Sequence, residues 1–328
     1  MQESQGKAPA SEVFSGVITR NAIEDMAGAI RQFYDLEAEQ LEPGSCRCQI
    51  DFIAAGQTFL YREHYPLRTR MVGELLGNRF GLAVPLLGSE SKFSGELVGP
   101  SQLPSAMTGE EIELVAAGGF KHLVVLLDHE RLIQAAEQAG MPREVQSSLR
   151  RGRTGMPLAA KPQAVAAFAR RVQHLLRQAA AGELQITADQ FEEWVHGQTL
   201  SILDVKEQPM GRPPGAALVR RAIEIADDYP GPAPVATLCR LLRVSPGTLE
   251  NAFKTATGVT PHAFFLRRRL TRARNVLLRE DPQQRRVTEI ATELGFSELG
   301  RFAVRYRQMF GESPSDTLRR TNTTVAAG

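Results

Sequence analysis

The C-terminal third of the chain contains an internal repeat, which restricts its possible folds more than any other feature. Residues 238–245 align with residues 290–297 at an offset of 52, with apolar residues at matching positions. At an offset of 53, Leu249, Phe253, Gly258 and Pro261 match Phe302, Tyr306, Gly311 and Pro314. Two copies that differ by one inserted residue are not expected by chance, so the sequence predicts one supersecondary unit used twice.

Each copy has the pattern of a helix-turn-helix. A short helix is predicted to begin near Pro234 in the first copy and near Val287 in the second, and a tight turn follows it. Val244 or Phe296 is placed to fill the angle between the two helices. Ser245 is the expected N-cap of the first copy's second helix, with Pro246 at the favoured first position.

The second helix of each copy has an outward face suited to the major groove of DNA. In the first copy the predicted DNA-binding residues are Ser245, Gly247, Thr248, Glu250, Asn251 and Lys254. In the second copy they are Glu298, Gly300, Arg301, Val304 and Arg305. Asn side chains pair with adenine, Arg with guanine, and apolar groups with the thymine methyl, so both faces could read bases. The alternative is that these are merely exposed polar positions.

A long helix is expected between the copies, from His262 to Arg279. Such a helix would fix the separation of the two recognition helices, so that they enter major-groove faces about one helical turn, ~34 Å, apart. The helix carries several arginines. We expect Arg267, Arg268 and Arg272 to contact phosphates, although some arginines should instead pair with nearby Asp or Glu.

Charge divides the chain. Residues 212–328 contain 19 Lys and Arg against 11 Asp and Glu, a net charge of +8, whereas the whole chain carries only +2. A basic back half suggests that this part meets a polyanion. Residues 204–215, rich in Pro and Gly, are the predicted linker between an effector-sensing and dimerisation domain (1–203) and a DNA-binding domain (216–320). Residues 321–328 are predicted to be a disordered tail.

The first domain is expected to be β-rich over about 45–127 and helical over about 128–203, which gives an α+β chain. Short alternating runs separated by turns suggest a barrel or sandwich. Asp128 is the expected N-cap of the first helix after the strands. An effector pocket could be lined by Phe52, Phe59, Tyr61 and Phe80, although aromatic residues on a strand are more often core. Cys46 and Cys48 have no further ligand pair nearby, so neither a metal site nor a cofactor is predicted.

The second copy resembles the signature of the AraC/XylS family. The resemblance lies in residues 289–297, Arg301-Phe302 and residues 306–314 (YRQMFGESP), and it covers about residues 216–320. It implies an all-α domain of seven helices with two helix-turn-helix units, preceded by a domain that senses an effector or dimerises, often a cupin-like β-barrel with helices. Residues 299–303 and 308–312 are also similar to the ethanolamine-operon regulators, which points to a small amine as effector.

Two departures from the family pattern affect the first turn and the recognition faces. Arg243 stands where the first turn often has Gly, so we expect that turn not to need a left-handed residue. Gly247 and Gly300 are small where relatives often place a base-reading side chain. More weight therefore falls on Asn251, Arg301, Arg305 and DNA shape.

These features predict a transcription regulator, an effector-responsive activator of a small catabolic operon. The expected partners are an operator duplex with repeated half-sites, RNA polymerase, a second copy of the chain and a small-molecule effector, with no membrane. The chain is expected in the cytoplasm, at the nucleoid, because neither an apolar run nor a signal-peptide pattern occurs. The alternatives are a cupin-type enzyme, disfavoured by the lack of a ligand cluster, and a protein-binding repeat, disfavoured by the charge.

Overall fold

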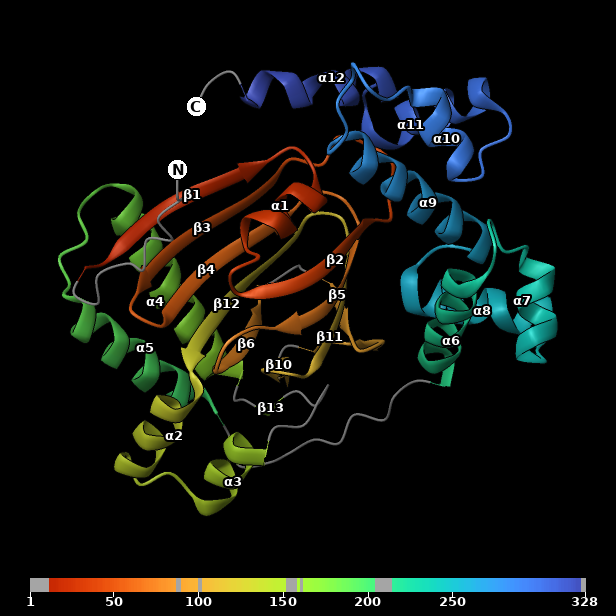
Figure 1. Cartoon of the computed structure of the whole chain (residues 1–328). Helices are drawn as coiled ribbons and strands as arrows, with labels where there is room; N and C mark the ends of the chain where they lie inside the picture. Colours follow the sequence, from red (N-terminus) through yellow and green to blue (C-terminus); the bar gives the residue numbers. More distant parts are fainter. Residues whose placement is uncertain are drawn as a thin grey trace.

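The structure is a computed structural model that describes residues 12–86, 90–99, 102–151, 158–159, 162–203 and 214–325. Strands predominate up to Asp128, helices follow up to Ile202 with one short strand among them, and the described elements from Pro214 onward are all helices (Figure 1). The expected α+β class is confirmed. Most of the predicted linker, residues 204–213, lies outside the described residues.

Six strands form the larger sheet. Its strand order is β1 (Phe14–Arg20), β3 (Cys48–Ala55), β4 (Thr58–Tyr65), β12 (Phe120–Asp128), β6 (Arg79–Pro85) and β10 (Ser105–Met107). All neighbours in this sheet are antiparallel. The predicted runs around Ile50, Tyr61 and Leu82 therefore are strands. The sequence interpretation missed β1, which begins well before the expected start of the β-rich region.

A second sheet of five strands packs against the first. Its order is β2 (Tyr34–Gln40), β5 (Thr69–Leu75), β11 (Glu111–Ala116), β7 (Ser91–Phe93) and β8 (Glu96–Leu97). A small pair, β9 (Gln102–Leu103) and β13 (Leu158–Ala159), forms a third sheet. Among the described strands the two large sheets stay separate, so the architecture is a sandwich and the expected closed, cupin-like barrel is not confirmed.

Alternation along the central strand β12 separates two cores. Val124 and Leu126 point into the space between the sheets, where they join residues of β3, β4, β5 and β11. Leu123, Val125 and Leu127 point the other way and pack against helices. All five side chains are at most 5% exposed. A strand buried on both faces reads as a continuous apolar run, which is what residues 123–127 show.

Helices cover the outer face of the larger sheet (Figure 1). They are α2 (His129–Gln138), α3 (Arg143–Arg151), α4 (Pro162–Ala180) and α5 (Ala188–Ile202). Asp128 caps α2 as predicted, because its carboxylate accepts a hydrogen bond from the Arg131 backbone N–H. A short helix that the sequence interpretation missed, α1 (Ile23–Ala29), packs on the core between the sheets through Ile23 and Met26.

The C-terminal helices form two further cores that share one helix. They are α6 (Pro214–Asp228), α7 (Val235–Leu242), α8 (Pro246–Thr257), α9 (Pro261–Leu277), α10 (Val287–Glu293), α11 (Leu299–Phe310) and α12 (Pro314–Val325). Phe264 of α9 belongs to the core of α6, α7 and α8. Leu270, Ala273 and Leu277 of the same helix belong to the core of α10, α11 and α12.

Helix α12 extends to Val325 and so includes most of the segment expected to be a disordered tail. Buried Thr317 and Leu318 dock the first half of this helix, which contacts α9 and α11. Only residues 326–328 of that tail lie outside the described part of the chain.

Candidate nucleic-acid interface and effector cavity

The first helix-turn-helix is formed by α7 and α8, and its turn departs from the expectation. Ser245 caps α8 as predicted, with its hydroxyl accepting from the Thr248 N–H at 3.1 Å and Pro246 at the first position. Arg243, however, adopts a left-handed conformation, φ 55° and ψ 41°. The prediction that this turn avoids such a residue is wrong. The turn between two packed helices requires that geometry, and the arginine accepts the strain.

The second helix-turn-helix, α10 and α11, uses glycine at the same place. Gly295 has φ +76°, and Phe296 fills the angle between the helices at 6% exposure. The Arg269 guanidinium lies 4.3 Å from the centre of the Phe296 ring. The second recognition helix starts after Glu298, whereas the first starts after Ser245. The inserted residue of the second copy therefore lies between the turn and the recognition helix.

The outward faces of α8 and α11 are open. Leu249 and Phe253, like Phe302 and Tyr306, point inward and are at most 2% exposed. Most of the predicted base-reading residues are exposed: Ser245, Gly247, Thr248, Asn251, Lys254, Glu298, Gly300, Arg301 and Val304. Glu250 and Arg305 are half-buried. A face with buried anchors behind it and polar residues in front is the geometry that enters a major groove.

Ion pairs occupy part of each face. Lys254 Nζ lies 2.7 Å from the Glu250 carboxylate, and Arg301 Nη1 lies 2.9 Å from that of Glu298. These pairs join residues about one turn apart on a helix whose side chains are about half exposed, so each contributes a few tenths of a kcal/mol, ~0.3–0.5. Both basic side chains can therefore be released to a base or a phosphate at little cost.

The α9 arginines are placed differently from the prediction. Arg268 is only 9% exposed, and its guanidinium lies 2.8 Å from Glu39 and 3.1 Å from Asp227. Arg272 pairs with the same Asp227, at 2.5 Å. The structure therefore pairs Arg268 with carboxylates, of which only Glu39 is buried, and its expected phosphate contact stays a prediction.

Arg267 also faces the N-terminal half rather than solvent. It donates a hydrogen bond to the Leu41 carbonyl, and burial lowers its pKa below the usual range of arginine. Its predicted phosphate contact does not fit this placement. Of the three predicted arginines, Arg272 is the most exposed, Arg267 is intermediate and Arg268 is buried.

The two halves of the chain are in contact along β2 and the loop after it. Arg70 lies 3.3 Å from Glu39 and 2.9 Å from Glu113, which continues the buried network that Arg268 enters. The carbonyl of Met309, near the end of α11, accepts hydrogen bonds from Gln40 Nε2 at 2.9 Å and from the Gly44 N–H at 3.0 Å. The N-terminal half therefore touches the second recognition helix directly.

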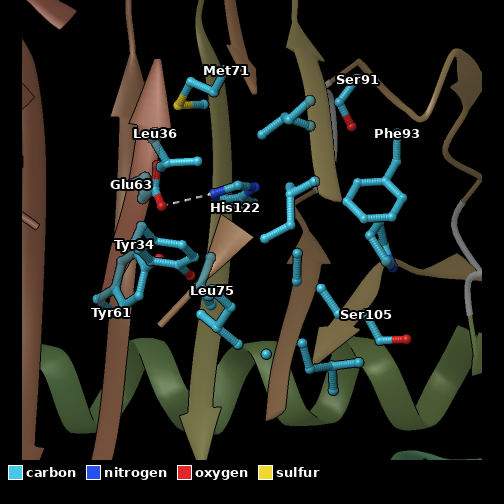
Figure 2. Close-up of a pocket in the computed structure, with 18 of the residues that line it drawn as sticks. Tyr34, Leu36, Tyr61, Glu63, Met71, Leu75, Ser91, Phe93, Ser105 and His122 are labelled. Atoms are coloured by element: carbon cyan, nitrogen blue, oxygen red, sulfur yellow. Dashed lines mark hydrogen bonds and ion pairs between the residues drawn. The ribbon is translucent and has the colours of Figure 1, made fainter. Parts of the chain in front are cut away.

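A cavity of about 80 Å³ lies between the two sheets. Its lining is mostly apolar and includes Leu36, Met71, Leu75 and Phe93 (Figure 2). At roughly 10–15 Å³ for each water-sized group, it has room for about six such groups. The cavity is the candidate effector site because it lies inside the sandwich and is lined by both sheets.

Of the four aromatic residues predicted to line an effector pocket, only Tyr61 does so. Phe80 points to the opposite face of the sheet and packs under the helices. Phe59 stacks on Phe33 with ring centres 4.3 Å apart, and Phe52 packs on Phe59 at 5.4 Å. These three form core, which is the more common role of strand aromatics.

Two buried polar residues, Glu63 and His122, line the cavity, and the sequence analysis predicted neither as a pocket residue. His122 Nε2 lies 3.3 Å from Glu63 Oε1, and the two residues face each other across β4 and β12 (Figure 2). Burial would raise the pKa of Glu63, but the charge of His122 and the nearby hydroxyls of Tyr65 and Tyr61 outweigh it and lower that pKa. The lowered pKa favours the ionised form of Glu63, although its side chain is buried. The sequence did contain a signal for Glu63: it lies two residues after Tyr61 on the same strand, and alternate strand residues share a face.

Two features are absent from the ranges that the structure describes. No helix there is long and apolar enough to cross a membrane. Within the same ranges, no cluster of three or more His, Cys, Asp or Glu is arranged to hold a metal ion.

Two helix-turn-helix units joined by α9 define the class of the C-terminal half, a helix-turn-helix domain. Comparison with known proteins gives its family. Residues 238–320 match the family model described as a helix-turn-helix domain. A transcriptional activator of the XylDLEGF operon from Pseudomonas putida is 44% identical over 89 residues, 27% of this chain and 28% of that protein. A probable thc operon regulatory protein from Rhodococcus erythropolis is 39% identical over 109 residues, a third (33%) of each chain. This C-terminal region is a helix-turn-helix domain of the AraC/XylS family.

Solved structures are also similar. The AraC-like transcriptional activator CuxR aligns over 79% of this chain and 95% of its own, with a TM-score of 0.41 and 12% identity. A probable AraC family transcriptional regulator from Rhodopseudomonas palustris covers 32% of this chain and 97% of its own, at 39% identity and a TM-score of 0.29. The chain matches only about a third or less of the length of the two curated regulators above.

Proposed function

We propose that the chain is a sequence-specific transcription regulator that binds an operator duplex through α8 and α11. The observation that carries the proposal is the placement of both recognition helices on α9, with each outward face exposed and each inward face buried in its own core. A helix of 17 residues is about 25 Å long, so the two units are held at the scale of one turn of DNA. Homologous domains in operon activators support the same function.

The N-terminal half is proposed to regulate this binding. Its cavity would hold a small-molecule effector. Because this half directly contacts α9 and α11, effector binding would change the DNA affinity of the recognition helices. We further propose that the chain acts as a dimer on repeated half-sites, recruits RNA polymerase and activates a small catabolic operon. A protein of this kind works in the cytoplasm, where the chromosomal DNA lies.

Selection of bound DNA by the full chain tests the proposal. The purified protein is mixed with a pool of randomised duplexes at low and at moderate salt, and the retained DNA is sequenced. The expected result is a bipartite motif with two parts about one helical turn apart, and weaker retention at the higher salt. Retention without sequence enrichment, or no retention at low salt, would contradict it.

A further inference from the structure

The buried carboxylate of Glu63 is incompletely satisfied. Its Oε1 faces His122, and the hydroxyls of Tyr61 and Tyr65 lie near the carboxylate, but its Oε2 is buried and accepts no hydrogen bond of normal geometry from the described residues. A buried charged acceptor without a partner is costly, and native structures rarely leave one in that state. Glu63 is also among the residues that line the cavity between the sheets. The free oxygen is therefore a docking point for a donor inside the cavity.

The remaining lining restricts what that donor is. Among the described residues that line the cavity, none is Lys or Arg. The only basic side chain among them is His122, whose Nε2 lies 3.3 Å from Glu63 without a hydrogen bond of normal geometry. An anionic ligand beside His122 would therefore also meet the Glu63 carboxylate. Rings of Tyr34, Tyr61 and Phe93 also line the space, and aromatic faces attract ammonium groups. The chemistry favours a cation with a short apolar body.

We propose that this cavity binds a small protonated amine, with its ammonium group paired to Glu63 Oε2 and its few carbons against the apolar wall. The volume of about 80 Å³ excludes large ligands. The inference rests on the proposed function, since it names the chemical class of that regulator's effector.

Strand β2 connects this site with the DNA-binding half. Tyr34 and Leu36 of β2 line the cavity. Glu37 and Glu39 of the same strand pair with Arg268 of α9, at 3.4 and 2.8 Å. Alternate residues of a strand point to opposite faces, so one short strand contacts the ligand on one side and α9 on the other. Filling the cavity would therefore shift a strand whose outer carboxylates hold the recognition domain.

Ligand binding by the full chain tests the proposal. The probes are n-butylammonium, 1-butanol and butyrate, which have similar size and differ in charge, and binding is followed by calorimetry and by thermal stability. Saturable binding of the ammonium, with none for the alcohol or the acid, is expected. Binding of butyrate in preference to the ammonium, or equal binding of all three, would overturn the proposal.

Three variants locate the site. Glu63→Gln should weaken ammonium binding at least tenfold, and Asp51→Asn should leave it unchanged, because Asp51 pairs with Arg62 outside the cavity. Ala106→Leu fills the cavity without changing Glu63 and should also abolish binding. This variant tests the site even if Glu63→Gln fails to fold. Undiminished binding by a folded Glu63→Gln protein would refute the assignment.

Operator binding is measured in parallel, without amine, by the selection described above. If the chain selects a DNA motif but binds no ammonium, only the effector class is wrong. If it selects no motif, the proposed function fails whatever the ligand results show.

Discussion

The Arg268 guanidinium of α9 lies 2.8 Å from the Glu39 carboxylate of β2, and both side chains are almost fully buried. This ion pair joins the sandwich to the helix that carries both recognition units. Glu39 also meets Arg70, and Arg268 also meets Glu37 and Asp227, so the contact is a network. Removing one member of a buried pair leaves the other charge uncompensated, which makes the network testable.

Arg268→Ala should reduce the stability of the full chain. We expect a loss of about 3 kcal/mol in the free energy of unfolding, because Glu39 stays buried after it loses one of its two arginine partners. Urea unfolding followed by circular dichroism measures it. The matched control is Arg279→Ala, an exposed arginine just beyond the end of α9, which should change stability by no more than about 0.5 kcal/mol. Equal effects of the two variants would show that the network adds nothing.

Arg243→Gly should stabilise the protein. The left-handed backbone at Arg243 costs an L-residue roughly 1–2 kcal/mol, whereas glycine adopts it freely. The greater flexibility of glycine in the unfolded chain offsets part of the gain, so we expect about 1 kcal/mol and a higher Tm.

The reciprocal change in the second copy is its control. Gly295→Ala should destabilise, because φ is +76° there and a Cβ would approach Pro232 Cγ to 2.6 Å. Differential scanning calorimetry of the two variants should therefore show shifts of opposite sign. A lower Tm for Arg243→Gly would mean that the arginine side chain makes a stabilising contact that outweighs its strain.

Glu24 of α1 predicts a pH dependence of stability. Both of its carboxylate oxygens are buried and accept no hydrogen bond from the described residues. Burial raises its pKa from 4.5 to about 7, with Arg274 opposing the shift and Asp25 and Glu39 adding to it. Between those pH values the folded state holds a proton that the unfolded state has released. The contribution is therefore fully present below pH ~4.5 and is lost as the pH rises towards 7.

Glu24→Gln removes that titration while keeping the shape of the side chain. The variant should gain stability relative to the parent as the pH rises from about 4.5 to 7, by roughly 3 kcal/mol at the upper end. Urea unfolding of both proteins at a series of pH values measures the difference. Parallel curves over that range would contradict the prediction.

Arg301→Ala and Asn251→Ala should each weaken binding to the selected operator by about 1–3 kcal/mol, or roughly 5- to 150-fold. Because the two residues lie on different recognition helices, each variant should relax preference in only one part of the motif. Repeating the selection with each variant shows which part. Arg319→Ala, an exposed arginine on α12, is the control and should keep both parts. Loss of both parts in one variant would argue against independent reading by two helices.

The sequence by itself determined the DNA-binding half. Buried positions such as Leu249, Phe302 and Tyr306 recur at helical spacing, and Ser245 with Pro246 marks a helix start, so local patterns are sufficient there. The same local logic predicted the strands around Ile50, Tyr61 and Leu82. Whether the outward residues read bases stays a prediction.

Only the tertiary structure determined the contacts between the two halves, the polar pair in the cavity and the turn at Arg243, because these features depend on how separate elements pack together. The sequence shows that Arg268 lies on a helix but not that it pairs with Glu39, in a strand far upstream. It shows that Tyr61 and Glu63 share a strand face, but the register that sets His122 opposite Glu63 comes from the pairing of β4 with β12. The left-handed Arg243 follows from the packing of α7 against α8, which outweighs the local preference of arginine. Local periodicity fixes which face of an element is buried, whereas only long-range packing fixes what that face meets.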